Sequence, residues 1–207
     1  MPLPERFETW NLVYREGPSA VFDAAFLDSV DQGHALKRMN ECWAECPSGD
    51  LLDRMLWYDW KLTLADNDLR KVSQMCELAG VRVSYPMLDE ELVDLSIKVP
   101  SAAKISGQEL RTFFKQAVRD LLPAEIIRKQ KHGFGLPFGV WLKTHKPLQD
   151  LVYRTLESVR ERGILRRDFV DRVATEHRSG HAGYYGYAIW DMVMLEHWLQ
   201  RQPAGSL

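Results

Sequence analysis

Apolar residues recur every three or four positions along most of the chain, which is the spacing of one face of an α-helix. The spacing predicts a helix over residues 18–33 that Pro18 opens and Gly33 closes. A second helix is predicted after Ser48-Gly49-Asp50, because Asp50 can act as its N-cap and apolar residues then recur as far as Leu64.

The acidic run Asp66-Asn67-Asp68 stands where a third helix is expected to begin, and Gly80 where it is expected to end. Carboxylates in such a run can hold Mg²⁺ or orient a cation such as Lys71, which stands three residues after Asp68. Helix capping accounts for the same residues, and on local grounds it is the favoured interpretation.

The remainder of the pattern is helical with one exception. Alternating residues over 81–85 predict a short extended stretch, which Pro86 ends. Further helices are expected over 88–99, over 109–122, just after Pro123, near 146–160, near 167–178 and over the aromatic stretch 187–198. One weak strand against seven or eight helices predicts a mainly α chain.

The regular pattern breaks at residues 131–139, where three glycines and one proline predict a loop whose backbone can approach a ligand closely. The basic run Arg128-Lys129-Gln130-Lys131-His132 leads directly into this loop, so an ammonium group and backbone N–H groups could face a phosphate together. Taken by itself, the basic run favours a solvated turn without a ligand. Nucleic-acid binding is a third and weaker interpretation.

The amino-acid composition limits the classes of partner and site that these patterns allow. The chain is 45% hydrophobic and 27% charged, with a formal charge of −2, which is typical of a globular protein without global attraction to nucleic acid or membranes. Three cysteines are an odd number and too few for a disulfide scaffold, which favours the cytoplasm. The sequence shows neither a signal peptide nor a membrane span, and its scattered histidines predict no metal site.

An ordered series of short motifs carries the most specific information in the chain. Its pieces are Leu69-Arg70-Lys71-Val72, Met75, Pro86-x-Leu88-Asp89, Leu92-Val93, Val99-Pro100, Lys104, Phe114-Lys115, Leu122-Pro123-x-x-Ile126, Lys131-x-Gly133-Phe134, Pro137 and Trp141. In order and spacing the series resembles the asparagine synthetase (glutamine-hydrolysing) family, in the C-terminal part of its ATP-pyrophosphatase synthetase domain. The core of the resemblance covers residues 66–141, and a weaker helical tail covers 146–202.

The resemblance implies a fold and a domain organisation. The chain is expected to be the helical C-terminal portion of an adenine-nucleotide alpha-hydrolase-like α/β synthetase domain, with the nucleotide-loop sheet missing. Residues 1–207 then form a single partial domain.

The resemblance also implies chemistry for the full-length protein, which would use ATP and Mg²⁺ to adenylate a carboxylate, aspartate by default. Ammonia from a glutamine-hydrolysing domain would then displace AMP, as in a carbon–nitrogen ligase of asparagine biosynthesis. Lys131 matches the family lysine that contacts the phosphates and stabilises charge developing during the reaction. Asp68, Lys71, Gly133 and Phe134 match positions near the family's substrate and nucleotide sites.

Several departures limit what this chain is expected to do alone. The family nucleotide loop, Ser-Gly-Gly-x-Asp-Ser, does not occur, nor does the glutaminase cysteine, and both are expected upstream of residue 1. Without the nucleotide loop, the isolated chain is expected neither to bind ATP tightly nor to be active. Arg82 occupies a substrate-site position where the family usually has glutamate, which leaves sugar or peptide carboxylates open as acceptors.

Two hypotheses follow for what the chain is. Either it is the C-terminal part of a longer amidotransferase, or it is a non-catalytic helical binding or scaffold protein descended from that domain. In the first case its partners are the upstream synthetase and glutaminase regions. Without these regions, apolar helix faces are expected to be exposed and to drive self-association. Neither nucleic acid nor a membrane is expected as a partner.

Overall fold

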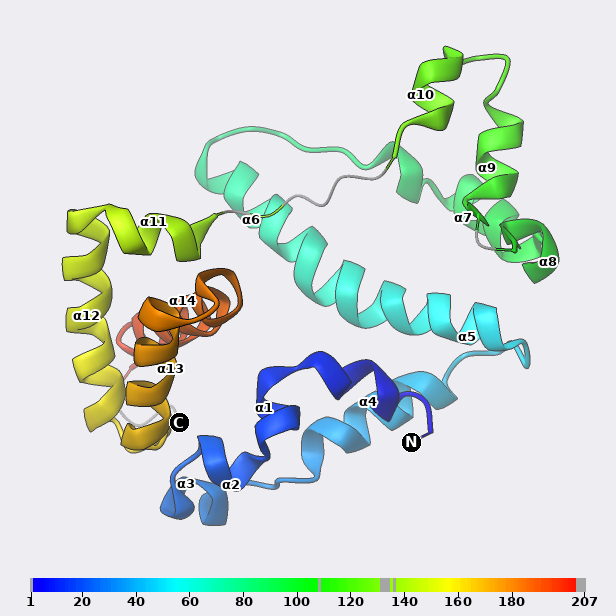
Figure 1. Ribbon diagram of the computed structural model, residues 1–207. Coiled ribbons are helices and arrows are strands. Elements are labelled where there is room, and N and C mark those ends of the chain that lie inside the picture. Colours follow the sequence, from blue (N-terminus) through cyan, green and yellow to red (C-terminus); the bar gives the residue numbers. More distant parts are fainter. Residues whose placement is uncertain (1, 108, 131–134, 136, 204–207) are drawn as a thin grey trace. The chain divides into compact units, whose positions relative to one another are not determined.

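The computed structural model describes residues 2–107, 109–130, 135 and 137–203, and this part of the chain is mainly helical (Figure 1). Its regular β structure is one antiparallel pair of two-residue strands, β1 (Ile105–Ser106) and β2 (Glu109–Leu110). The expected mainly α fold is therefore confirmed. The chain divides into unit 1, residues 1–35 and 133–207, and unit 2, residues 36–132. The description as a single partial domain stays a prediction.

Unit 1 joins the two ends of the chain. Its elements are the 3-10 helix η1 (Glu5–Trp10) and the helices α1 (Leu12–Glu16), α2 (Pro18–Val21), α3 (Ala24–Ser29), α11 (Phe138–Thr144), α12 (Lys146–Glu161), α13 (Arg167–Ser179) and α14 (Ala182–Leu199). The helices predicted near 146–160, 167–178 and 187–198 are confirmed as α12, α13 and α14. Helix α14 packs against α11, α12 and α13.

The core of unit 1 follows the helical spacing of the sequence. Helix α12 buries Val152, Leu156 and Val159 at intervals of four and three residues. Helices α13 and α14 contribute Val173 and Ile189, which are likewise fully buried. Complete burial of one such aliphatic side chain stabilises a fold by about 1.5–3 kcal/mol. This core holds the C-terminal helices together.

The prediction of one helix over residues 18–33 is wrong. The structure has the two short helices α2 and α3, separated at Phe22. Phe22 forms an isolated antiparallel bridge with Leu165, and Asp23 donates its backbone N–H to the carbonyl of Ile164 at 2.9 Å. This pairing with a distant segment supplies hydrogen bonds that replace those of a continuous helix, and Asp23 then caps α3.

Unit 2 contains most of α4 (His34–Ala44), which begins at its boundary. Its other helices are α5 (Leu51–Tyr58), the π-helical segment η2 (Asp59–Leu69), α6 (Arg70–Leu78), the 3-10 helix η3 (Pro86–Leu88), α7 (Glu90–Lys98), α8 (Ser101–Lys104), α9 (Thr112–Ala117) and α10 (Ala124–Arg128). Asp50 caps α5 as expected, since its carboxylate accepts the N–H of Asp53 at 3.1 Å.

The prediction that Asp66-Asn67-Asp68 caps a third helix is wrong. Helix α5, η2 and α6 follow one another without interruption, so these residues lie inside a helical run (Figure 1). Leu69, the residue before α6, has helical dihedral angles and makes no capping hydrogen bond. Continuing a helix adds a hydrogen bond with each residue, whereas starting a new one requires a costly first turn, so a capping signal alone did not create a helix end.

Three further predictions need correction. The loop predicted over 131–139 ends earlier, because Phe138 and Gly139 belong to α11. Residues 81–85 form no strand; they connect α6 to η3 without regular structure. The helix expected over 109–122 is confined to α9, because Glu109–Leu110 pairs with Ile105–Ser106 instead. The stop at Gly80, with its positive φ of 66°, is confirmed, as are a helix over most of 88–99 and the short helix after Pro123.

Unit 2 has a small core at the junction of α4 and α5. Trp43 and Tyr58 are both buried and meet edge to face, with ring centroids 6.1 Å apart. The guanidinium of Arg54 lies 4.8 Å from the centre of the Trp43 ring and donates to the Trp43 carbonyl at 3.2 Å. These contacts fix α5 against α4.

Candidate functional site

Asp68 and Lys71 are the two candidate residues that the structure brings into direct contact. They lie one helical turn apart, at the end of η2 and the start of α6, and the ammonium donates to the Asp68 carboxylate at 2.9 Å. Their side chains are 48% and 60% exposed. An exposed pair of this kind contributes little to stability, so both charges remain available to a ligand or to another part of a longer protein.

Arg82 lies in the irregular segment between α6 and η3. Its side chain is exposed, and within the described residues no carboxylate pairs with it. The positive charge at this position is therefore open to solvent. No interaction in the described structure links it to Asp68 or Lys71.

Lys131, Gly133 and Phe134 lie outside the described residues, so the structure does not test their predicted roles. The described residues around them include Gln130, two positions after the end of α10, and Pro137, the residue before α11. Helix α10 belongs to unit 2 and α11 to unit 1, and the division of the chain into units falls between residues 132 and 133.

Helix α11 lies unusually close to α14. A Cβ atom added to Gly186 would lie 2.5 Å from the Cα atom of Gly139, and one added to Gly139 would overlap the carbonyl oxygen of Ala182. Two glycines are therefore required for the helices to approach this closely. Phe138 and Trp190 pack edge to face next to them, with centroids 4.7 Å apart.

The fully buried side chain of His177 adds a contact between α13 and α11. The Nε2–H group of His177 on α13 donates to the carbonyl of Gly139 at 2.8 Å, which leaves Nδ1 without a partner among the described residues. Burial lowers the pKa of His177, and the nearby cations Lys143 and Arg178 act in the same direction. The imidazole ring of His177 is therefore neutral at pH 7. A neutral ring keeps one N–H group, and that group is enough to donate to the Gly139 carbonyl.

The start of α5 carries a polar network that the sequence interpretation missed. Lys104 donates to the Asp53 carboxylate at 2.7 Å, and Ser48 donates to the other oxygen of the same carboxylate at 3.0 Å. Ser101 donates to Asp50 at 2.6 Å. The hydrogen bond from Lys104 is the largest influence that lowers the pKa of Asp53, and the bond from Ser101 is the largest for Asp50.

This network joins α8 to the N-terminus of α5. Lys104 belongs to the ordered series of motifs, but its partner Asp53 stands far away in the sequence, and nothing in the local pattern pairs the two. All four acidic and hydroxyl side chains are satisfied within the network. Its role is therefore to position α8 and the strands that follow it.

The described residues contain no cluster of metal ligands. Within them no group of three His, Cys, Asp or Glu side chains is placed to hold a metal ion, and the Asp68 carboxylate is paired with Lys71. No helix in the described part of the chain is long and apolar enough to cross a membrane. A bound nucleotide with Mg²⁺ would need groups beyond those described.

Comparison with known proteins gives consistent matches. The asparagine synthase family model matches residues 3–200. A Mycobacterium bovis protein that bears the provisional name of asparagine synthetase (glutamine-hydrolyzing) is 25% identical over 156 residues, which are 75% of this chain and 24% of that protein. Asparagine synthetase (glutamine-hydrolyzing) 1 of Bacillus subtilis is 20% identical over 156 residues, with the same coverage of 75% and 24%.

These matches define how much of such a protein the chain represents. The chain spans about a quarter of the length of the curated relatives that it matches. No solved structure shows significant similarity to it.

Proposed function

Because the chain belongs to the asparagine synthase family, we propose that it is the C-terminal part of a longer, ATP-dependent amide-forming enzyme. The observation that carries this proposal is the contrast in coverage. The family model matches residues 3–200, nearly the whole chain, whereas the matched region is only 24% of each relative. We propose that the nucleotide loop Ser-Gly-Gly-x-Asp-Ser belongs to the remaining part of this longer protein. The longer protein is proposed to act in the cytoplasm.

The proposed reaction has two steps. An oxygen of the acceptor carboxylate, aspartate by default, attacks the α-phosphorus of ATP, and pyrophosphate leaves. The nitrogen of glutamine-derived ammonia then attacks the acyl carbon, the bond to AMP breaks, and the nitrogen loses a proton. Lys131 contributes a positive charge where negative charge accumulates on the phosphates. Asp68, Lys71, Arg82, Gly133 and Phe134 are the proposed substrate- or nucleotide-binding residues.

Exposed apolar side chains on α6 support the proposal of a missing partner. Val72, Met75 and Leu78 recur every three residues, and these residues are 41%, 58% and 81% exposed. A row of large apolar groups in water is typical of a covered interface. We infer that the upstream synthetase and glutaminase regions cover such faces in the longer protein, and that a second copy covers them when this chain is alone.

Self-association can be measured directly. We expect light scattering of the isolated chain to show a mass above that of the monomer that rises with concentration. A Met75→Ser, Leu78→Ser double variant should shift the distribution toward monomer, because less apolar area is removed from water in the complex. The control is an Arg70→Ser, Lys71→Ser double variant, which changes two exposed residues on the same helix. A monodisperse monomer at high concentration would contradict the inference.

The function itself is tested by comparing two proteins. A longer reading frame that contains this chain and a Ser-Gly-Gly-x-Asp-Ser loop should release pyrophosphate from ATP when given aspartate and glutamine. The 207-residue chain alone should not, since one lysine cannot replace a phosphate cradle. Pyrophosphate release by the chain alone, or the absence of an upstream frame with that loop, would refute the proposal.

Arg82 favours a second candidate, a non-catalytic helical binding or scaffold protein. An arginine replaces the glutamate usual in the family, and it is exposed without a carboxylate partner among the described residues. A chain released from catalysis can lose such a glutamate. An inactive longer protein in which Arg82→Glu restores no activity would favour this alternative.

A further inference from the structure

The structure contains a basic hollow in unit 2 between α9 and α10, with a volume of about 410 Å³. Its lining includes Glu109, Thr112, Lys115, Gln116, Arg119 and Arg128. Three of these side chains are cationic and one is acidic, so the lining is strongly positive in a chain whose net charge is −2. The concentration of charge is therefore local, as expected of a binding site for an anion.

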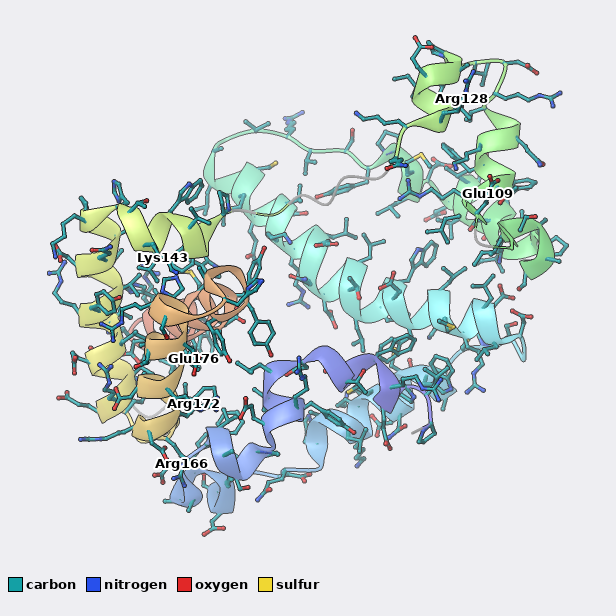
Figure 2. All side chains as sticks on the ribbon, viewed as in Figure 1. Glu109, Arg128, Lys143, Arg166, Arg172 and Glu176 are labelled. Carbon is teal, nitrogen blue, oxygen red and sulfur yellow. The ribbon has the colours of Figure 1, made fainter. Side chains whose placement is uncertain are left out.

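Two short helices build this hollow. Thr112, Lys115, Gln116 and Arg119 stand at positions i, i+3, i+4 and i+7, which places them on one side of α9 and the turn after it. The chain then reverses at Pro123, and α10 supplies Arg128 from the opposite side. In Figure 2, Arg128 is labelled on α10 and Glu109 close to α9. The cations thus come from two elements that converge on one space.

The cations that line this hollow have few partners of their own among the described residues. Within the described residues neither the Lys115 side chain nor the Arg128 side chain forms a hydrogen bond or an ion pair. Arg119 lies 3.5 Å from Asp120, but both side chains are more than two-thirds exposed, at 71% and 86%, so this contact is weak. By contrast, four arginines of unit 1 are paired with carboxylates: Arg160, Arg162, Arg166 and Arg172.

We propose that this hollow is a binding site for a small, multiply charged phosphate anion of the pyrophosphate class. Three positive groups around one space repel each other, and a multivalent anion relieves that repulsion while it accepts charge-assisted hydrogen bonds. The guanidinium groups of Arg119 and Arg128 suit phosphate oxygens, and Lys115 adds a third positive charge. The Thr112 hydroxyl, which donates to the Glu109 carbonyl at 3.1 Å, and the Gln116 amide add polar groups.

This proposal uses described residues alone and does not rest on the proposed function. Its residues are all described, whereas Lys131 is not, and the site needs neither the upstream region nor a reaction. A small anion is favoured over nucleic acid because the chain has a net charge of −2 and so exerts no global attraction on a polyanion.

Calorimetric titration of the whole chain with pyrophosphate, without magnesium and at low ionic strength, tests this site. We expect saturable binding at millimolar pyrophosphate or below, weakened at least about ten-fold by Lys115→Gln, Arg128→Gln. The control is Lys146→Gln, Arg166→Gln, which removes the same charge from exposed side chains that are paired with Asp150 and Asp168. That control should change the affinity less than two-fold, and circular dichroism should show both variants folded.

Several results would overturn the proposal. These are no binding at millimolar pyrophosphate, equal weakening in both double variants, and tighter binding of an oligonucleotide than of pyrophosphate. A loss of binding on Lys131→Gln alone, with Lys115→Gln, Arg128→Gln unaffected, would also overturn it and would assign the anion to the Lys131 loop. The two sites, and the failure of either, are thereby distinguished.

Discussion

Gly139→Ala should reduce the free energy of unfolding of unit 1 by about 3 kcal/mol, near the upper end of overpacking effects in protein cores. The added methyl group would overlap the carbonyl oxygen of Ala182, so α11 and α14 would have to separate. Separation would stretch the hydrogen bond from His177 to the Gly139 carbonyl and loosen the packing of Phe138 on Trp190. Gly186→Ala should have a similar effect, because its methyl group would meet the Cα atom of Gly139.

Urea titration combined with hydrogen exchange of the α11 and α14 amides measures this effect and locates it in unit 1. Gly49→Ala makes the same chemical change in unit 2, at a glycine without a positive φ where an added methyl group would meet only open space. It should leave stability within about 0.5 kcal/mol of the parent or raise it slightly. Equal effects of Gly139→Ala and Gly49→Ala would show that the close approach of the two helices is not tight.

Lys131→Ala should lower the rate of pyrophosphate release by the longer, ATP-dependent protein about 10²–10³-fold, as expected when one preorganised positive group is removed from a reacting centre. The reason is that no other residue of this chain matches the family lysine that faces the phosphates. The effect should appear mainly in kcat, because the charge is needed most where negative charge develops. Steady-state assays of pyrophosphate release with varied ATP measure both parameters.

Lys131→Arg keeps the charge but moves it, so we expect an intermediate rate. Lys37→Ala removes a charge from an exposed position on α4 and should leave both parameters unchanged. If Lys131→Ala retained the parent rate, the loop would serve structure alone, and the assignment of Lys131 to the reaction would be wrong.

Local signals in the sequence were reliable where the chain itself supplied every partner. Asp50 caps α5 with a hydrogen bond to a residue three positions away, and Gly80 ends α6 with the positive φ that glycine tolerates. Local signals failed where another segment competed. Phe22 left the predicted helix to pair with Leu165, and residues 109–110 paired with 105–106 rather than extending α9.

Spacing, motif order and caps act over a few residues, so they were sufficient to predict the helical character of the chain, its membership of the asparagine synthase family and the cap of α5. Contacts between distant groups became visible in the folded chain alone. The tertiary structure placed Gly139 against Gly186, Lys104 on Asp53, and Arg128 across from Lys115 around one hollow. Such contacts depend on how helices pack and where the chain reverses, and no periodicity along the sequence specifies them.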